Sequence, residues 1–428
     1  MPDFYIRDPV HGFIAYDDWE REIINHPAFQ RLRRIRQLAL TELVYPGATH
    51  TRFPHALGTM HVATRMFDAI VKRQWDYLSH ERGYDQAGIS RDRQIVRLAA
   101  LLHDVGHSPF SHSGETLFPV NAEDDRRYHH EEYSASIIEN VFRDTIEQHQ
   151  GNWNYDIKAS DVADLVSGNT NLSNQSSVRR LLWRPLVTSQ LDADRCDYLL
   201  RDSLHAGVSY GRYDLDRILA TINLGLSESD DPVVAIEEGG WHAAEGLIIA
   251  RYSMFTQVYF HHTRQALDHH VEQVLKELLI NDYDRAEFPL PDVQGLEEYL
   301  KWDDWMVLGR IARDEAGEHG ENIMNRTLYR SVYETGETPD EAEIQRFEEV
   351  SARLEELVAF VGNATRPWYS LGTQDLMIVP NDSQEPKRGR PLSEYSTIVG
   401  NMKSVEQRRI FVRPSDRDQA RISLERIF

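Results

Sequence analysis

The chain has 428 residues, 41% of them hydrophobic and 27% charged, which excludes a disordered, collagenous or low-complexity protein. It carries 47 Lys and Arg against 69 Asp and Glu, a formal net charge of −22. The chain as a whole therefore repels nucleic acids, anionic membranes and nucleotides. A polyanionic substrate would need a local reversal of this field, which a metal ion and a cluster of arginines would provide.

Cysteine usage and the N-terminus indicate the compartment. Cys196 is the only cysteine, which excludes an intrachain disulfide and a thiolate metal cage. The first residues, MPDFYIRDPVHGF, contain acids and a proline where a secretory signal needs an apolar stretch. No run approaches the ~20 apolar residues that cross a bilayer. We therefore expect a cytoplasmic protein without a membrane partner.

The pattern in the first half of the chain is predominantly helical. Residues 8–16 predict a turn and a strand, because Pro and Gly mark the bends. A helix with one apolar and one basic face is predicted after Pro27, over AFQRLRRIRQLAL. Another helix is predicted to begin near His55.

A buried helix is predicted over residues 95–102, where apolar residues recur at helical spacing. It runs directly into His103 and Asp104. Gly106 and Pro109 then force the backbone out of the helix, so the histidines that follow are expected on a loop. Loops on a rigid scaffold commonly carry function.

Three further helices are predicted from apolar periodicity. One begins at about His129, and a second covers 186–202 and contains an unusual number of aspartates. Residues 243–280 contain no proline and predict one long helix, with Arg251 and Tyr259 on a single stripe.

The pattern changes after about residue 280 to acidic linkers and to the strand-like runs LMIVP, RRIFVRP and ARISLERI. We therefore predict a mainly α protein with a helical core over residues 1–280. A smaller α+β appendage, with a regulatory or assembly role, is predicted over 281–428. The basic segment PNDSQEPKRGRPLSEYS is predicted to be a mobile loop, either an ordinary solvated one or a contact for phosphate or nucleic acid.

Four ionisable residues stand out near predicted helix ends: His55, His103, Asp104 and Asp194. Imidazole nitrogens and carboxylate oxygens together bind Mn, Fe, Co, Ni or Zn. Each histidine taken alone could be an ordinary core residue. Several ionisable groups in one apolar neighbourhood are costly, however, unless a cation or one another compensates them. The set therefore predicts a divalent transition-metal site.

Four blocks in order, YPGATHTRFPHALG, LLHDVGHSPFSH, YHHEE and LDADRCDYLLRD, resemble the HD-domain metal-dependent phosphohydrolases, in their dNTP triphosphohydrolase branch. The likeness runs from about Asp8 to about His270. It implies an HD-domain helical core. The metal ligands that it implies are His55, His103, Asp104 and Asp194.

The resemblance also implies catalytic and substrate-binding residues. His112 matches the family's general acid, His107 a further active-site histidine, and His130 with Glu131 the adjacent His–Glu pair. The implied phosphate contacts are Arg52, Tyr198, Arg251 and Arg195, which replaces a lysine of the family. The implied sugar contacts are Gln37 and Asp202 at the 3′-hydroxyl, and Leu38 and Tyr259 at the 2′ carbon.

The activity implied by the resemblance is hydrolysis of a dNTP to deoxynucleoside and triphosphate, with Mg²⁺ on the substrate phosphates. Two alternatives remain: an HD-type nuclease or nucleotide phosphodiesterase, and a nucleotide sensor without turnover. Nucleic acid is the less favoured partner, given the net charge. A homo-oligomer is expected, and dNTP pool control and phage defence both stay open as roles. Asn25 departs from an aspartate of the family's activator site, so activation by guanine nucleotides does not transfer.

Overall fold

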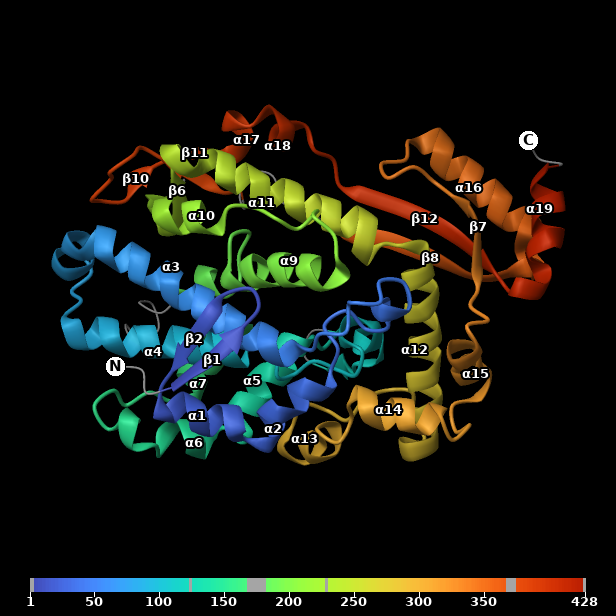
Figure 1. Ribbon diagram of the computed structural model, residues 1–428, viewed down its shortest axis with the longest axis horizontal. Coiled ribbons are helices and arrows are strands. Elements are labelled where there is room, and N and C mark those ends of the chain that lie inside the picture. Colours follow the sequence, from blue (N-terminus) through green and yellow to red (C-terminus); the bar gives the residue numbers. More distant parts are fainter. Residues whose placement is uncertain (1–3, 123–124, 168–181, 228–229, 367–374, 426–428) are drawn as a thin grey trace.

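The protein is mainly α-helical with small sheets, as the sequence predicted (Figure 1). The computed structural model describes residues 4–122, 125–167, 182–227, 230–366 and 375–425. The helices are α1 (Asp18–Asn25), α2 (Pro27–Gln30), α3 (Arg52–His80), α4 (Gln86–Leu102), α5 (His130–Asn140), α6 (Arg143–Glu147), α7 (Ala159–Ser167), α9 (Ala193–Ala206), α10 (Leu215–Thr221), α11 (Trp241–Met254), α12 (His262–Tyr283), α13 (Val293–Tyr299), α14 (Asp304–Ile311), α15 (Gly317–Asn325), α16 (Glu341–Leu354), α17 (Leu392–Tyr395), α18 (Thr397–Asn401) and α19 (Arg417–Glu425). The strands are β1 (Phe4–Asp8), β2 (Gly12–Tyr16), β3 (Val120–Asn121), β4 (Arg126–Arg127), β5 (Ile222–Leu226), β6 (Pro232–Glu237), β7 (Arg330–Glu334), β8 (Val358–Arg366), β9 (Met377–Val379), β10 (Lys387–Arg388), β11 (Arg390–Pro391) and β12 (Val405–Val412).

The helical core is built from α3, α4, α5, α7 and α9, whose apolar faces share one hydrophobic cluster. In α4, Ile95, Leu98 and Leu102 follow the helical spacing and are fully buried. Burying each such side chain contributes ~1.5–3 kcal/mol. This packing fixes the ends of α3, α4 and α9, where the predicted metal ligands lie.

The segment after Pro27 does not form the single amphipathic helix that the sequence predicted. α2 ends at Gln30, a 3-10 turn covers Arg31–Arg34, and the backbone is extended at Ile35. A tertiary contact explains why the helix is interrupted, because Arg31 is buried. Its guanidinium donates hydrogen bonds of 2.8–3.3 Å to three backbone carbonyls, two in the loop after α4 and one just before α14.

Residues 243–280 form two helices, whereas the sequence predicted one. α11 and α12 are separated by a π-helical turn, Phe255–Tyr259, and by the N-cap residue His261. The Nδ1 atom of His261 accepts a hydrogen bond of 3.2 Å from the backbone N–H of Thr263. π-turns are rare and occur frequently at functional sites. Here the turn carries Tyr259 to the wall of a pocket.

Two sheets contain strands from the second half of the chain. One has the strand order β10-β5-β6-β9-β11 and the other β7-β12-β8. β6 pairs antiparallel with β5 and parallel with β9, so the two predicted regions contribute to the same sheet. A boundary near residue 280 stays a prediction. In Figure 1, α12 stands between the helices of the N-terminal half and the β7-β12-β8 sheet.

The strand-like runs near the C-terminus had mixed outcomes. LMIVP contains β9 and RRIFVRP contains the second half of β12, as predicted. The prediction for ARISLERI was wrong, because its described residues, 420–425, lie in helix α19. Ala420 and Leu424 of α19 pack in the same cluster as Phe347 and Ile410. A spacing of four residues lies on one helix face, which explains the difference. The basic segment 380–396 is not a plain loop either, because it contains β10, β11 and α17.

A pocket of about 750 Å³ lies where the core meets the second half of the chain. Its lining comes from the loop after α4, from α9, from the π-helical turn, from α12 and from β8. None of the described helices has the length and apolar character needed to cross a membrane.

Candidate active site

The four predicted metal ligands converge at one end of this pocket. His55 lies in the first turn of α3, which begins at Arg52 and so starts slightly earlier than predicted. His103 and Asp104 follow α4, and Asp194 lies in the first turn of α9. His55 Nε2 lies 3.0 Å from Asp194 Oδ1 and 3.5 Å from Asp104 Oδ2. His103 Nε2 lies 3.2 Å from Asp104 Oδ1 and 3.7 Å from Asp194 Oδ1.

Each histidine of this set is oriented through its other ring nitrogen. His55 Nδ1 lies 2.7 Å from Asp197 Oδ2, and His103 Nδ1 lies 2.8 Å from the carbonyl oxygen of Ala100. Because these acceptors hold the Nδ1 protons, the Nε2 atoms face the other ligands. Both Nε2 atoms are buried and have no hydrogen-bond partner. Two such nitrogens beside two carboxylates fit a divalent transition metal.

Electrostatics at this end of the pocket demand a cation. Burial lowers the pKa of His55, but the Asp194 and Asp197 carboxylates, 3.0 and 2.7 Å from its two ring nitrogens, outweigh it and raise this pKa to about 10. Burial raises the pKa of Asp104, but the Arg52 guanidinium beside it holds that pKa well below its usual range. The two histidines likewise lower the pKa of Asp194 in spite of its burial. The carboxylates therefore stay ionised, and protons or a metal must balance them.

Asp197 supports the site from behind, and the sequence did not predict this role. Its Oδ1 lies 2.7 Å from His11 Nε2, and Arg201 donates two hydrogen bonds of 2.8 Å to its carboxylate. Arg201 donates a third, also 2.8 Å, to Asp8. Gly58 of α3 permits the close approach, because a Cβ there would lie 1.8 Å from Asp197 Oδ1. Asp197 follows the predicted ligand Asp194 by three residues, about one helical turn of α9, and this spacing could have identified it.

The predicted catalytic histidines gather around a carboxylate that the sequence analysis missed. His112 Nδ1 and His130 Nδ1 lie 2.9 Å and 2.7 Å from Glu115 Oε1, and His107 Nδ1 lies 3.6 Å from it. Glu131, the predicted partner of His130, lies farther from the same nitrogen, at 3.4 Å, and lines the pocket. Glu115 follows His112 by three residues, a helical spacing that could have indicated it.

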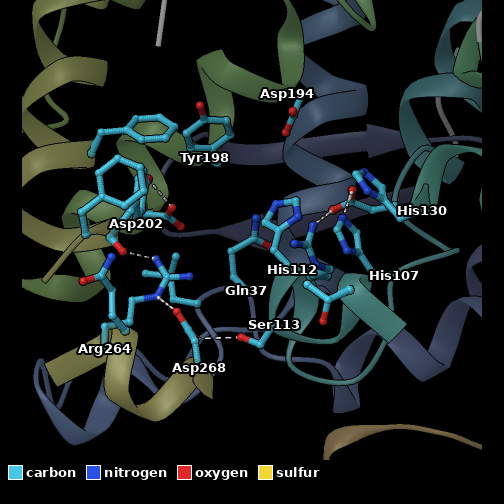
Figure 2. A pocket seen from close by; sticks show the side chains of 18 of the residues that line it. Gln37, His107, His112, Ser113, His130, Asp194, Tyr198, Asp202, Arg264 and Asp268 are labelled. Atoms are coloured by element: carbon cyan, nitrogen blue, oxygen red, sulfur yellow. Dashed lines mark hydrogen bonds and ion pairs between the residues drawn. The ribbon is translucent and has the colours of Figure 1, made fainter. Parts of the chain in front are cut away.

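The other end of the pocket is built around Asp202 (Figure 2). The Tyr259 hydroxyl donates a hydrogen bond of 2.6 Å to Asp202 Oδ2, and His50 Nε2 lies 2.7 Å from Oδ1. Burial raises the pKa of Tyr259 well above its ordinary value, so the hydroxyl remains a donor. Gln37 and Leu38 line the same pocket, and Gln37 Oε1 is buried without a hydrogen-bond partner. His50 was not predicted.

Arginines supply positive charge to the pocket. Arg195 is paired with Asp192, and Arg251 Nη1 donates a hydrogen bond of 3.1 Å to Gln190 Oε1. The Nε atoms of both arginines are buried without a hydrogen-bond partner. Arg264 of α12, which the sequence did not predict, also lines the pocket. Guanidinium N–H groups without partners suit an anionic ligand.

The structure brings the predicted site residues together. All of them line the pocket except His55, which is buried behind it. Arg52 is paired with Asp104 and donates a 2.8 Å hydrogen bond from Nε to Ser111 Oγ, so it already has partners. Burial raises the pKa of Tyr198 to about 12, which keeps its hydroxyl neutral. The roles of these residues stay predictions.

Two family models match the chain. The HD domain model matches residues 52–202, and the HD associated region model matches residues 213–365. The first match contains the four converging ligands. The second contains the π-helical turn, α12 and most of β8, which line the rest of the pocket.

Curated relatives cover most of the chain. An uncharacterized protein, YwfO, from Bacillus subtilis is 31% identical over 89% of this chain and 81% of the relative. The Dictyostelium discoideum deoxynucleoside triphosphate triphosphohydrolase SAMHD1 homolog is 28% identical over 77% of this chain, and mouse SAMHD1 is 26% identical over 87% of it. The chain covers 60% of the length of each of these two proteins.

A solved structure has the same overall fold. The crystal structure of a hypothetical protein from Aquifex aeolicus matches with a TM-score of 0.76 and 27% identity, over 98% of this chain and 99% of that one. These matches agree with the convergent His and Asp ligands. The chain belongs to the HD-domain superfamily, carries an HD-associated region, and has dNTP triphosphohydrolases among its relatives.

Proposed function

We propose that the protein is a metal-dependent dNTP triphosphohydrolase, which converts a dNTP to a deoxynucleoside and triphosphate. The observation that carries the proposal is the combination, in one pocket of about 750 Å³, of convergent metal ligands, unsatisfied arginines and the Asp202–Tyr259 pair. A volume of this size suits a nucleotide-sized ligand. The names of the Dictyostelium and mouse relatives agree with it.

The charges of the pocket fit a triphosphate. The four converging ligands would hold a divalent transition metal, which supplies Lewis-acid polarisation of a phosphoryl oxygen and an activated water. Arg52, Arg195 and Arg251 would neutralise the phosphates. They would make this part of the pocket positive although the whole chain has a net charge of −22. Mg²⁺ would accompany the β- and γ-phosphates, because it prefers waters and phosphate oxygens to an all-protein cage.

His112 would act as the general acid. Its Nδ1 is held 2.9 Å from Glu115 Oε1, and its side chain is 39% exposed in the wall of the pocket where the substrate would bind. Water attacks the α-phosphorus and the bond from phosphorus to the 5′-oxygen breaks. The His112 proton passes to that oxygen, so a neutral deoxynucleoside leaves and the water oxygen stays on the triphosphate.

The Asp202 end of the pocket would select the sugar. Asp202 would accept a hydrogen bond from the 3′-hydroxyl, with Gln37 beside it. Leu38 and the Tyr259 ring would crowd the 2′ carbon. A ribonucleotide would then bury its 2′-hydroxyl without a hydrogen-bond partner, which costs roughly 1–3 kcal/mol.

Product analysis tests the proposal directly. Metal-depleted protein is incubated with each dNTP, each rNTP and single-stranded DNA, then Mn²⁺ is restored and the products are separated by chromatography. We expect deoxynucleoside and intact triphosphate in equal amounts from dNTPs. Shortened oligonucleotides would indicate the nuclease alternative, and nucleotide binding without turnover would indicate a sensor. Either result overturns the proposal.

Two variants test the residue roles within the same assay. We expect His112→Gln to lower kcat by about 10²–10⁴-fold, as for loss of a general acid. We expect Tyr259→Ala to raise rNTP turnover relative to dNTP turnover. The matched variant Tyr259→Phe keeps the ring and should keep the discrimination. Unchanged turnover in His112→Gln would remove that residue from the mechanism.

A further inference from the structure

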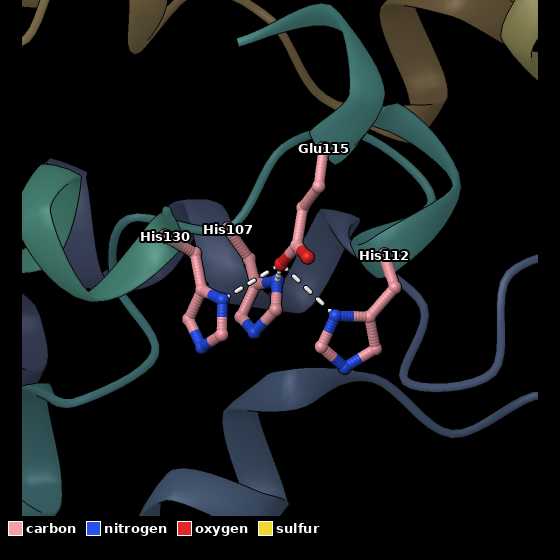
Figure 3. Close-up of side chains that lie close together, drawn as sticks. All are labelled: His107, His112, Glu115 and His130. Carbon is pink, nitrogen blue, oxygen red and sulfur yellow. Dashed lines mark hydrogen bonds and ion pairs between the residues drawn. The ribbon is translucent and has the colours of Figure 1, made fainter. Parts of the chain in front are cut away.

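Three imidazole nitrogens converge on a single carboxylate oxygen beside the HD ligands (Figure 3). Glu115 Oε1 lies 2.7 Å from His130 Nδ1, 2.9 Å from His112 Nδ1 and 3.6 Å from His107 Nδ1. One possible ligand atom from each of the four residues lies within 4.8 Å of the other three. The set contains none of the four HD ligands.

The surrounding structure holds the cluster in place. The rings of His107 and His130 are stacked, with centroids 3.8 Å apart. The backbone of His107 is fixed by Arg31, which donates a 2.9 Å hydrogen bond to its carbonyl oxygen. Glu115 lies in the 3-10 turn Ser111–Leu117, and α5 begins at His130. The donor atoms are therefore positioned in advance rather than gathered from mobile side chains.

Hydrogen bonds leave this cluster unsatisfied. His107 Nδ1 and His130 Nδ1 are buried and neither makes a hydrogen bond, although His130 Nδ1 lies close to the Glu115 carboxylate. His107 Nε2 lies 3.2 Å from Asp104 Oδ1, so the ring proton of His107 belongs on Nε2, where this carboxylate can accept it. The Nδ1 lone pair of His107 then faces a carboxylate oxygen. Two electron-rich atoms oppose each other, which is unfavourable unless a cation lies between them.

The charge of the cluster favours a cation as well. The Glu115 carboxylate oxygen Oε1 faces three imidazole nitrogens within 3.6 Å. The side chain of His107 is 1% exposed, and those of Glu115 and His130 are each 15% exposed. A partly desolvated anion with three imidazoles around it is a strong site for a divalent ion.

We propose that Glu115, His107, His112 and His130 form a second metal site, distinct from the HD site, for a divalent transition metal such as Zn²⁺ or Co²⁺. Three imidazoles and one carboxylate are the N and O donors that these ions prefer in a four-coordinate site. Mg²⁺ is disfavoured, because it selects oxygen ligands. The side chain of His112, which is 39% exposed, gives an ion access from the pocket.

The second site has a consequence for catalysis that rests on the proposed function. An ion bound to His112 Nδ1 takes the position of the proton that the Glu115 carboxylate otherwise accepts. The same imidazole then cannot serve freely as the general acid. Zn²⁺ beyond one equivalent should therefore inhibit hydrolysis rather than support it.

Metal counting tests the second site without any substrate. Protein is depleted of metal, titrated with Co²⁺, and assayed by visible absorption and by elemental analysis after gel filtration. We expect two Co²⁺ per chain in the wild type. Glu115→Gln should retain one, with binding of the second weakened by at least about 100-fold. The matched HD-site variant Asp194→Asn should lose the other ion and keep the one at Glu115.

Two results would overturn the second site: a wild-type chain that saturates at one Co²⁺, or a Glu115→Gln chain that still binds two. If Glu115→Gln does not fold, as judged by circular dichroism, His112→Gln replaces it, because this exposed side chain tolerates substitution better. It too should bind one ion. Absence of dNTP hydrolysis would contradict the proposed function alone, since the ion count is made without nucleotide.

Discussion

Histidines in two regions of the protein behave in opposite ways. Beside the candidate metal ligands and Glu115, burial lowers the pKa of His55 and His130, but neighbouring carboxylates outweigh it and raise these values to about 10 and about 9. On α12, burial lowers the pKa of His269 to about 4 and that of His270 to about 3, and neighbouring histidines add to the effect. The difference therefore comes from the partners and not from burial.

The α12 histidines pack as neutral rings. His269 stacks on Phe360 with ring centroids 4.0 Å apart. His270 Nε2 accepts a hydrogen bond of 3.3 Å from the backbone N–H of Tyr329, so the neutral ring carries its proton on Nδ1. That proton can be donated to His319 Nδ1, which lies 2.9 Å away.

The comparison teaches what makes a buried histidine cluster a cation site. Carboxylates lie beside His55 and His130 and favour a balancing charge, whereas His269 stacks on an aromatic ring and His270 contacts a backbone N–H and another histidine. A hydrogen bond of 2.7 Å from Ser113 Oγ to Asp268 Oδ1 connects the two regions, because Ser113 follows His112 in the 3-10 turn Ser111–Leu117 and Asp268 precedes His269 on α12 (Figure 2). Three variants sharpen this comparison.

The largest effect is expected from Asp197→Asn, which removes a carboxylate behind the metal ligands. The affinity of the HD site for metal should fall about 10–100-fold, because the orientation of His55 weakens. The free energy of unfolding should fall by about 3–5 kcal/mol, because the buried guanidinium of Arg201 loses its main partner. Elemental analysis after dialysis and denaturant unfolding measure the two effects.

The matched control is Asp68→Asn, which removes a carboxylate from an exposed pair. Asp68 accepts hydrogen bonds of 2.7 and 2.9 Å from Arg93. The cost should be at most about 1 kcal/mol, because water screens exposed pairs. Equal losses in the two variants would contradict the special role of the buried carboxylate.

An effect that is intermediate in size for each pH unit is expected from pH acting on the α12 set. The pKa of His270 is about 3 in the folded chain, compared with an ordinary value near 6.5, so the unfolded chain binds more protons between these values. The free energy of unfolding should therefore fall as pH decreases from about 6.5 toward 3, by about 1.4 kcal/mol per pH unit for this residue. Unfolding midpoints measured across this range test the slope.

His270→Asn should flatten that slope, because asparagine does not titrate and its side-chain N–H can still face His319. The control is His80→Asn, at the exposed end of α3, which should leave the slope unchanged. If the wild type, His270→Asn and His80→Asn all lose stability equally as pH falls, then the α12 histidines do not cause the loss of stability in acid.

The smallest effect is expected from Ser113→Ala, which removes the hydrogen bond between the two regions. The loss should be about 0.5–1.5 kcal/mol, the ordinary value for one partly exposed hydrogen bond. Hydrogen exchange should increase locally, both in the loop after α4 and in the first turns of α12. Ser90→Ala is the control, because its hydroxyl donates an exposed hydrogen bond to the carbonyl oxygen of Gln86 within α4. Faster exchange confined to one region would argue against the link.

Much of the site could be predicted from the chain because its motifs are local. The dyad His103–Asp104 directly follows a helix whose apolar spacing is visible in the sequence, and Gly106 and Pro109 predict the loop that comes next. Glu115 and Asp197 were not predicted as site residues, although each stands one turn from a residue that was. This spacing is a signal, but an acid one turn from a site residue is also common on a solvated helix face, so tertiary contacts decided these two cases.

Other features depended on contacts between distant parts of the chain. The segment after Pro27 was predicted as one helix with a basic face, but its Arg31 is buried and donates hydrogen bonds to carbonyls of the loop after α4. The single helix predicted over 243–280 is interrupted by a π-helical turn, which places Tyr259 against Asp202. Helical periodicity does not report such an interruption, because the apolar spacing continues through it.

The sequence by itself determined the helical class, the identity of the candidate ligands and their order along the chain, since these follow from residue chemistry and from spacing within one or two helical turns. The tertiary structure decided which ring nitrogen of His55 and of His103 faces the other candidate ligands, and which carboxylates lie beside them. His11 and Asp197, for example, are 186 positions apart and meet at 2.7 Å. Such contacts depend on how helices pack, and packing is a property of the whole core rather than of any segment.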